Sequence, residues 1–350
     1  MNSKIMIAMS GGVDSAVSAY LASRDRTACG VTMRLAFDQD EHAKTAAQDI
    51  KDAASTCVAL GIPHVVAELS KEFRALVVNA FIRTYEEGKT PNPCIDCNKE
   101  IKFGALLRFA KEQGFDRLAT GHYARIEKNS EGRFLLRRAK DLTKDQTYVL
   151  YTLSQEVLSQ VEFPLGNMSK AEVKEVAAAQ GFAAVHRSES QDICFVPNGD
   201  YAAFIENYSG NAPRPGKFLS LDGRILGEHR GIVHYTIGQR KGLGISLGRP
   251  AFVVSKSAAD NTVTLGANED LFTRRLTVEH INFIPFDELR SPLTLLAKAR
   301  YRQEAAPARV EQTGKDELTV EFHEPQRAIS QGQSLVLYDG DYVIGGGKII

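Results

Sequence analysis

Three of the five cysteines lie in sequence settings that suit sulfur chemistry. Cys94 and Cys97 follow two prolines, and Cys97 comes directly before a stretch of helical character, residues 98–113. A thiol at a helix N-terminus near Lys99 and Lys102 is expected to have a lowered pKa and to be present as thiolate. Cys97 is therefore predicted to be a nucleophile.

A second reactive thiol is predicted at Cys194, which follows a polar stretch, residues 188–192, and precedes Pro197. Two thiols suit sulfur transfer because one can carry a persulfide while the other attacks it. Such an exchange leaves a disulfide between Cys97 and Cys194. The remaining cysteines, Cys29 and Cys57, lie in apolar stretches and are expected to be small buried hydrophobic residues.

Metal binding is the alternative use of these thiols. A zinc site is disfavoured, because no second C-x-x-C pair or paired histidine motif follows Cys94 and Cys97. A 4Fe–4S cluster held by Cys94, Cys97 and Cys194 stays open as an alternative, since three thiolates would leave one iron free to bind sulfide.

A glycine-containing turn, Ser10 to Ser15, follows an apolar run near the start of the chain and precedes a helical pattern. Such a turn directs backbone N–H groups and the positive end of the helix dipole at an anion, which favours a phosphate ligand. The turn lacks the Gly-Lys-Ser/Thr ending of a Walker loop and the spacing of the dinucleotide fingerprint. A pyrophosphate-binding loop is predicted, and a purely structural turn is the alternative.

These residues need a scaffold, and the first 200 residues alternate apolar strand-like runs with amphipathic helical stretches, which predicts a parallel sheet with helices on both faces. Several helical stretches end at a glycine suited to a C-cap, as at Gly61, Gly114 and Gly181. The expected strands are residues 4–9, 28–34, 64–69 and 117–121, and the expected helices are 14–24, 45–60, 71–86, 98–113 and 169–180.

From about residue 211 the pattern changes to short alternating runs with turn signals, which predicts an all-β region. Strands expected at 276–284, 293–302 and 334–338 suggest a small barrel. Three domains are predicted: an α/β catalytic domain at residues 1–208, a central β-rich domain at residues 209–270 and a C-terminal β-barrel at residues 271–350.

Composition sets wider limits. The chain has 350 residues, 43% hydrophobic and 25% charged, which is typical of a globular protein of two or three domains. Lys plus Arg and Asp plus Glu number 43 each, so the overall charge gives no sign of a polyanionic partner. The apolar run at residues 5–9 is too short for a signal peptide or membrane span, and a cytoplasmic protein without a membrane partner is expected.

Several motifs in order along nearly the whole chain resemble those of the tRNA-specific 2-thiouridylases. This family belongs to the N-type ATP pyrophosphatases, of the adenine nucleotide alpha hydrolase-like fold, which split ATP between the α and β phosphates. The matching stretches are residues 10–15, 92–103, 121–125, 144–148, 193–195, 235–244, 299–302 and 332–334.

The resemblance implies an ATP- and Mg²⁺-dependent reaction that adenylates and then thiolates C2 of the wobble uridine 34 in the anticodon arm of tRNAs for Lys, Glu and Gln. AMP and pyrophosphate are the other products. The sulfur would come from a cysteine desulfurase or a sulfur relay protein. Cys97 would be the attacking nucleophile, Cys194 would carry the persulfide, and a disulfide would join the two after turnover.

Binding residues also follow from the resemblance, position by position. Many family members carry an aspartate where this chain has Cys94, so proton handling at the base would differ here or Cys94 would mark the cluster-dependent variant. The ATP-binding residues would be Ala8, Met9, Ser10, Gly11, Gly12, Val13, Asp14, Ser15, Met33 and Gly121. Asn92, Pro93 and Cys94 would meet the target base, and His122, Lys144, Asp145, Gln146, Arg300, Tyr301 and Gln333 would contact tRNA.

Local basic clusters provide candidate phosphate contacts. Lys298, Arg300 and Arg302 are expected to share one face of a strand. Tyr123 or Tyr148 is expected to stack on a flipped-out base. A second cluster surrounds a hairpin and comprises Arg133, Arg137, Arg138, Lys140 and Lys144. A third cluster, Arg240 and Lys241, lies in a glycine-rich turn.

Two other functions stay open on the sequence. One is a different adenylating pyrophosphatase, such as a tRNA lysidine synthetase or an amidotransferase-type synthetase, which would not need paired cysteines. The other is a non-catalytic RNA-binding protein, which would release no pyrophosphate with tRNA and ATP.

Overall fold

A computed structural model describes residues 3–35, 43–182, 193–196, 199–210 and 213–350 of the chain. Its internal contacts divide it into two compact units, each described separately below. The first unit comprises Met1–Val77, Cys94–Gln191 and Gly340–Ile344, and the second comprises Val78–Pro93, Asp192–Asp339 and Gly345–Ile350. None of the described helices is long and apolar enough to cross a membrane.

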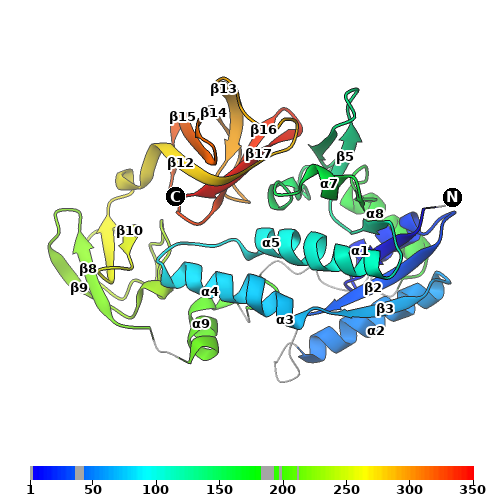
Figure 1. The fold of residues 1–350 in the computed structure, drawn as a ribbon. Coiled ribbons are helices and arrows are strands. Elements are labelled where there is room, and N and C mark those ends of the chain that lie inside the picture. The colour runs from blue at the N-terminus through cyan, green and yellow to red at the C-terminus, as the bar shows by residue number, and fades with distance from the viewer. Residues whose placement is uncertain (1–2, 36–42, 183–192, 197–198, 211–212) are drawn as a thin grey trace. The chain divides into compact units, whose positions relative to one another are not determined.

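The first unit is built on a parallel sheet with the strand order β3-β2-β1-β4-β7 (Figure 1). Ile5, Met6 and Ile7 of the central strand β1 are fully buried, as expected for a strand covered on both faces. The predicted parallel sheet is therefore confirmed. Its strands are β1 Ile5–Ala8, β2 Ala28–Arg34, β3 His64–Glu68, β4 Arg117–Ala119 and β7 Val161–Glu162.

The predicted helices are present, and two of them contain a π-helical segment that the sequence pattern did not predict. The stretch expected at 98–113 begins earlier, at Pro93, because proline suits the first turn of a helix. It runs through α5 Pro93–Asp96, the π-helix η2 Cys97–Ala105 and α6 Leu106–Glu112. The stretch expected at 71–86 comprises α3 Ser70–Phe73, the π-helix η1 Arg74–Val78 and α4 Asn79–Glu86.

Three other helices of the first unit, α1, α2 and α8, match their predicted positions, whereas α7 and the 3₁₀ turn η3 were not predicted. A positive φ follows three of the predicted helices, at Gly61, Gly114 and Gly181, which confirms the expected glycine caps. Helix α2 lies along β2 and β3, as Figure 1 shows. The bounds are α1 Val13–Ala22, α2 Ala43–Ala59, η3 Thr147–Val149, α7 Gln155–Leu158 and α8 Lys170–Ala179.

A hairpin of β5 Ala124–Lys128 and β6 Phe134–Arg138 completes the first unit. Arg137 of β6 is paired in register with Tyr342. The basic cluster expected around a hairpin does lie on and beside these two strands.

The second unit contains the predicted central β-rich region. Its four-stranded sheet has the order β10-β11-β8-β9, in which only β11 and β8 run parallel. Two helices of this unit, α4 and α9 Tyr201–Ser209, come before it in the chain. The strands are β8 Gly216–Ser220, β9 Ile225–His229, β10 Phe252–Ser257 and β11 Thr262–Gly266, with 3₁₀ turns η6 Ile232–His234 and η7 Glu269–Leu271.

A six-stranded barrel closes where β12 pairs with β17, which confirms the predicted C-terminal barrel. The expectation that Lys298, Arg300 and Arg302 share a strand is wrong, because β13 ends at Lys298 and a turn follows. The strands are β12 Phe272–Phe283, β13 Leu293–Lys298, β14 Ala306–Gly314, β15 Glu317–Arg327, β16 Ser334–Asp339 and β17 Tyr342–Ile349, in the order β12-β15-β14-β13-β16-β17.

Candidate functional site

The turn between β1 and α1 has the backbone of an anion-binding loop. Gly11 has φ +73°, a conformation that side chains other than glycine rarely adopt. Gly12 is the N-cap of α1 and, as a glycine, makes no side-chain capping hydrogen bond. The N–H groups of the first turn are thus not capped by the N-cap residue, and the helix dipole favours an anion there.

Two serine hydroxyls shape this loop. The buried Ser15 Oγ accepts a hydrogen bond of 3.1 Å from the Ser10 N–H and donates one of 2.8 Å to the Gly12 carbonyl. Ser10 is exposed, and its own Oγ lies 3.2 Å from Ser15 Oγ. Ser15 thus holds the turn together, whereas the Ser10 hydroxyl remains at the surface.

The carboxylate of Asp14 is engaged inside the protein. Lys170 Nζ donates to both of its oxygens, at 2.7 and 2.8 Å, and the Tyr123 hydroxyl donates to Oδ1 at 2.7 Å. The Lys170 side chain is only 11% exposed. This pair balances the negative charge of Asp14 beside the loop, which keeps the start of α1 favourable for phosphate.

The other predicted ATP-binding residues lie at the carboxyl ends of neighbouring strands. Ala8 and Met9 end β1, Met33 lies near the end of β2, and Gly121 follows β4. A Cβ on Gly121 would lie 3.0 Å from the carbonyl carbon of Asp14, so the backbone after β4 packs closely on the start of α1. Ligands of open α/β sheets bind at this edge, and the residues present fit a nucleotide.

Cys94 and Cys97 lie three positions apart in the helix that begins at Pro93, where Cys94 is exposed and Cys97 half-buried. Burial raises the pKa of the Cys97 thiol, and the nearby charge of Lys102 offsets only part of this effect. The expected lowered pKa of Cys97 is therefore wrong. Its physical reason is burial, which disfavours the charged thiolate.

The π-helix that begins at Cys97 explains why Lys102 acts on this thiol. A π-helix closes i to i+5 hydrogen bonds, so its turn returns residue 102 to the side of residue 97. Asn98 is 1% exposed, and its Nδ2 donates a 3.0 Å hydrogen bond to the Val149 carbonyl. Sequence reasoning missed the structural roles of Asn98 and Lys170, because each bonds to a residue far away in the sequence, Val149 and Asp14 respectively.

The segment before Asn92 and Pro93 is held by the barrel's own chain. Gln333 Nε2 donates to the carbonyls of Thr90 and Pro91 at 3.1 and 3.2 Å. The Thr90 N–H donates to the Gln331 carbonyl at 2.9 Å. The Gln333 amide is thus used within the protein, and its contact with tRNA stays a prediction.

His122 and the stretch from Lys144 to Gln146 are also engaged internally. His122 is 6% exposed, and its Nδ1 lies 2.7 Å from Thr120 Oγ1. Burial, reinforced by the charge of Lys102, holds the pKa of His122 well below its usual value, so the ring is neutral. Asp145 Oδ1 accepts from the Ala139 N–H at 3.0 Å, and Gln146 Oε1 from the Tyr123 N–H at 2.9 Å.

The two tyrosines expected to stack on a base are buried. Tyr123 and Tyr148 are 2% and 0% exposed, so neither ring offers a free face and that expectation is wrong. Tyr301 is 39% exposed, with Lys298 Nζ 5.6 Å from its ring centroid. Arg300 donates to the Ser330 hydroxyl at 2.9 Å and to the carbonyls of Ile237 and Ala328.

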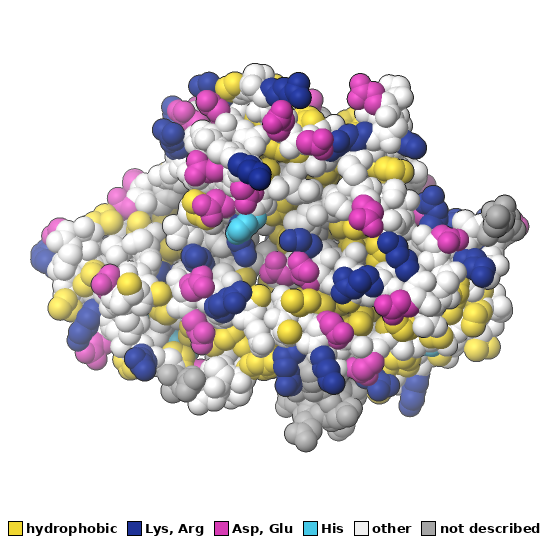
Figure 2. Space-filling model, in the orientation of Figure 1, with side chains coloured by type: hydrophobic (Ala, Val, Ile, Leu, Met, Phe, Trp, Pro, Cys, Tyr) yellow, Lys and Arg dark blue, Asp and Glu magenta, His cyan; other side chains and the backbone are white. Residues whose placement is uncertain are grey.

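Acidic partners offset much of the basic cluster at the hairpin. Arg137 pairs with Glu127 at 2.9 Å and with Asp341 at 3.2 Å, and Lys140 pairs with Glu172 at 2.9 Å. Figure 2 shows basic and acidic side chains interspersed on the face in view. At the hairpin, therefore, two of the five clustered basic side chains, Arg137 and Lys140, are already paired with acidic residues.

Cys194 is exposed and belongs to the second unit, whereas Cys97 belongs to the first. It occupies a turn in which the Val196 N–H donates to the Ile193 carbonyl at 3.0 Å. The polar stretch 188–192 and Pro197 lie outside the described residues. All five cysteines are free thiols, and the Cys97–Cys194 disulfide stays a prediction.

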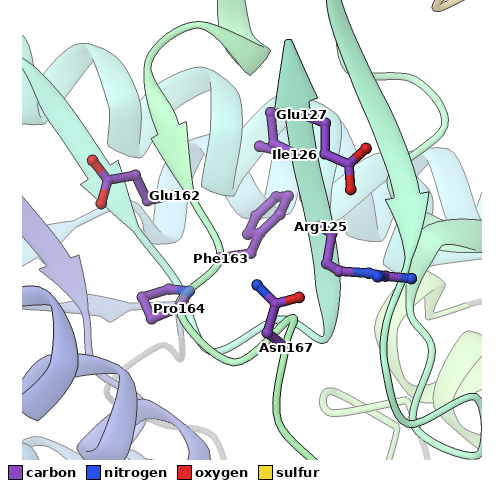
Figure 3. A pocket seen from close by; sticks show the side chains of 7 residues that line it. All are labelled: Arg125, Ile126, Glu127, Glu162, Phe163, Pro164 and Asn167. Atoms are coloured by element: carbon purple, nitrogen blue, oxygen red, sulfur yellow. The ribbon is translucent and has the colours of Figure 1, made fainter. Parts of the chain in front are cut away.

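A pocket of about 240 Å³ in the first unit is lined by none of the predicted site residues, although its lining residue Phe163 lies 5.8 Å from the His122 ring (Figure 3). Its charged side chains are engaged elsewhere: Glu162 pairs with Arg26 at 3.0 Å, and Glu127 with Arg137. We assign it no function. It is lined by Arg125, Ile126, Glu127, Glu162, Phe163, Pro164 and Asn167.

Comparison with known families covers nearly the whole chain in three consecutive segments. Residues 3–198 match the tRNA methyl transferase HUP domain, residues 202–267 the tRNA methyl transferase PRC-barrel domain, and residues 273–349 the aminomethyltransferase beta-barrel domain. The order of these segments agrees with the sheet, central region and barrel described above.

Three similar proteins each bear the name tRNA-specific 2-thiouridylase MnmA. The protein of Clostridioides difficile is 46% identical, over 100% of this chain and 98% of the relative. That of Lachnoclostridium phytofermentans is 44% identical, over 99% of each chain, and that of Treponema denticola is 43% identical, over 99% of this chain and 97% of the relative. With identity of this level over its full length, the chain belongs to the tRNA-specific 2-thiouridylase family.

Proposed function

We propose that this protein thiolates C2 of the wobble uridine 34 of tRNA, using ATP and a protein persulfide. The single observation that carries the proposal is full-length similarity to 2-thiouridylases across all three segments. The uncapped start of α1 and the two reactive-cysteine segments supply the chemistry that such a reaction needs. The substrates would be cytoplasmic tRNAs for Lys, Glu and Gln, with sulfur from a cysteine desulfurase or relay protein.

Adenylation is the first step of the proposed reaction. The uridine O2 attacks the α-phosphorus of ATP, the bond to the bridging oxygen breaks, and pyrophosphate leaves. The start of α1 and the Ser10 hydroxyl would bind the phosphates, with Gly11 and Gly121 leaving room for close approach. This step converts the C2 oxygen into a leaving group.

Sulfur transfer follows at C2. The terminal sulfur of a Cys194 persulfide attacks C2, AMP leaves with the O2 oxygen, and a disulfide links the base to Cys194. The Cys97 thiolate then attacks the Sγ atom of Cys194, which releases 2-thiouridine and leaves a Cys97–Cys194 disulfide. A thiol reductant supplies two electrons to restore both thiols. In a variant of this step, Cys97 first releases the persulfide sulfur as hydrosulfide, which then attacks C2.

The fit to metals is weaker than the fit to ATP. Across the described ranges, no group of three His, Cys, Asp or Glu side chains is arranged to hold a metal ion. Asp14 is ion-paired with Lys170. Mg²⁺ would therefore bind mainly through the phosphates of ATP, where it would neutralise the departing pyrophosphate. A 4Fe–4S cluster on Cys94, Cys97 and Cys194 is the alternative route for sulfur.

The test is thiolation of a U34-containing tRNA in vitro with ATP, a persulfide donor and a thiol reductant. The protein is purified once in air without metal and once anaerobically with iron and sulfide. Cys97→Ser and Cys194→Ser should each abolish thiolation in the metal-free enzyme, while pyrophosphate release in a single turnover persists. Cys29→Ala is the matched control, because Cys29 is buried in β2 and its loss should leave thiolation unchanged.

Two outcomes would contradict the persulfide mechanism. Activity found only in the iron-loaded sample would assign Cys94, Cys97 and Cys194 to cluster ligation. Full thiolation by both serine variants would show that neither thiol carries the sulfur, whereas pyrophosphate release without thiolation in the wild type and both variants would indicate a different adenylating enzyme.

A further inference from the structure

The turn that carries Cys194 is attached to the second unit by the ring of Phe195. Phe195 lies 5.3 Å from Phe81 of α4, with the two rings nearly perpendicular at 86°, and 5.4 Å from Phe204 of α9. Phe81 and Phe204 are themselves 6.3 Å apart. These three rings are in mutual contact: Phe81 meets both of the others edge to face, the geometry that aromatic side chains prefer, and Phe195 and Phe204 are tilted at 58°.

Further rings extend this set of three along both helices. Tyr85 lies 5.0 Å from Phe81 and is stacked on Tyr201 at 5.6 Å, and Tyr208 lies 5.6 Å from Phe204. Phe81 and Tyr85 are 0% and 4% exposed. The aromatic cluster, defined as Phe81, Tyr85, Phe195, Tyr201, Phe204 and Tyr208, thus has a buried centre at Phe81 and Tyr85 and half-buried or exposed rings around it, and the Cys194 turn packs on it through Phe195.

Within the turn, adjacent side chains have opposite environments. Cys194 and Phe195 are its two central residues, since the Val196 N–H donates to the Ile193 carbonyl. Cys194 is exposed, whereas Phe195 packs into the cluster and Val196 is 4% exposed. Phe195 is half-buried and Val196 buried, so the turn is held from the side of these two residues while the Cys194 side chain before them is exposed.

We propose that Phe195 is a positioning residue for sulfur transfer: its ring fixes the turn on the aromatic cluster and so presents the Cys194 thiol at the surface. This inference rests on the proposed function and extends it to a residue that carries no reactive group. A persulfide must meet two partners in turn, the donor and the activated base. A fixed starting direction shortens the search for both.

The test compares leucine substitutions at two rings of the same cluster. Phe195→Leu removes the ring that holds the turn, and Tyr208→Leu removes a ring whose neighbour in the cluster is Phe204. Both variants lose aromatic packing, so a purely structural role would affect them alike. Phe195→Tyr keeps the ring and is the conservative rescue.

Two readouts are made on the full-length protein. Single-turnover thiolation from a persulfide donor should slow on the order of 10- to 100-fold in Phe195→Leu, while pyrophosphate release stays within about twofold of the wild type. Hydrogen exchange of the Val196 amide should accelerate on the order of tenfold in Phe195→Leu, because its bond to Ile193 opens more often. Tyr208→Leu and Phe195→Tyr should resemble the wild type in both.

The two readouts separate failure of this inference from failure of the proposed function. Unchanged Val196 exchange and unchanged thiolation in Phe195→Leu would overturn the positioning role, as would equal losses in Phe195→Leu and Tyr208→Leu. Accelerated exchange in Phe195→Leu, with no thiolation by the wild type under any condition, would support the anchor and reject the proposed function.

Discussion

The phosphate-binding turn and the cysteine-bearing segments differ in how far the chain prepares them for chemistry. At the turn, Gly11 already has its left-handed conformation, Ser15 closes the loop, and Lys170 balances Asp14. At Cys97, by contrast, burial raises the thiol pKa and favours the unreactive protonated form. The Ser10–Ser15 turn, which we call the nucleotide side, thus has its conformation without substrate. The Cys97 segment, which we call the sulfur side, has a thiol that is not activated by its surroundings.

This difference suits a reaction whose sulfur must not be lost. A thiolate exposed at all times would react with any passing disulfide or oxidant. A raised pKa of the Cys97 thiol would slow such wasteful exchange if Cys97 acts as proposed. The charge on Lys102 lowers the pKa of Cys97 only in part, so the enzyme retains a route to the thiolate.

The largest effect is expected where the nucleotide side is distorted. In Gly121→Ala, the new Cβ would lie 3.0 Å from the Asp14 carbonyl carbon, so backbone must move and the start of α1 with it. We expect kcat/KM for ATP in tRNA-dependent pyrophosphate release to fall on the order of 100-fold.

The matched control is Gly114→Ala, at the end of α6. Gly114 has φ +78° and open space around it, so alanine there is strained but touches nothing. It should cost about 1 kcal/mol of stability and leave kcat/KM for ATP unchanged. A Gly121→Ala enzyme with wild-type kinetics would show that the turn is not preorganised.

A smaller effect is expected at the sulfur side, in Lys102→Gln. Because the charge of Lys102 lowers the pKa of Cys97, its removal should move that pKa upward. Alkylation of Cys97 by iodoacetamide, followed by peptide mass spectrometry, should then be slower at pH 8 and reach its half-maximal rate at a higher pH. Alkylation of exposed Cys194 serves as the internal control, and an unshifted Cys97 profile would contradict the role of Lys102.

The smallest effect concerns the helix that supports the nucleotide side. Ser169 and Glu172 form a capping box at the start of α8, which carries Lys170. The backbone N–H of Ser169, then Lys140, lowers the pKa of Glu172 from 4.5 to about 2. Its charge therefore stabilises the fold above pH 4.5, and this contribution is lost as the pH falls from 4.5 toward 2.

Glu172→Gln removes this dependence. We expect a slightly lower melting temperature than that of the wild type at pH 7 and a difference that narrows below pH 4.5, measured by circular dichroism. Ser169→Ala is the comparison, because its loss of a capping hydroxyl, about 1 kcal/mol, does not titrate. A constant difference across the pH range in Glu172→Gln would count against the charge effect.

Sequence patterns predicted most of the scaffold, because apolar runs such as Ile5 to Ile7 have few possible environments other than a doubly covered strand. They failed where a distant partner decides the local structure. Arg300 was expected on a strand with Lys298, yet its guanidinium hydrogen-bonds to the carbonyls of Ile237 and Ala328, and the chain turns there.

The candidate site divides in the same way. The Ser10 to Ser15 turn could be recognised because its function lies in local backbone geometry. The state of Cys97 could not, since it depends on burial and on a π-helix for which the sequence has no clear signature. The Asp14–Lys170 pair joins residues 156 positions apart and was likewise beyond local pattern reasoning.

The hydrogen bonds from Gln333 to Thr90 and Pro91 bear on the modularity of the protein. The C-terminal barrel matches a family model of its own, over residues 273–349, and could be taken for an independent module. Its chain, however, holds the segment that leads directly into Asn92 and the cysteine-bearing helix. Truncation or domain exchange would therefore remove the hydrogen bonds that hold this segment, and a fragment ending before the barrel would be an unreliable substitute for the whole protein.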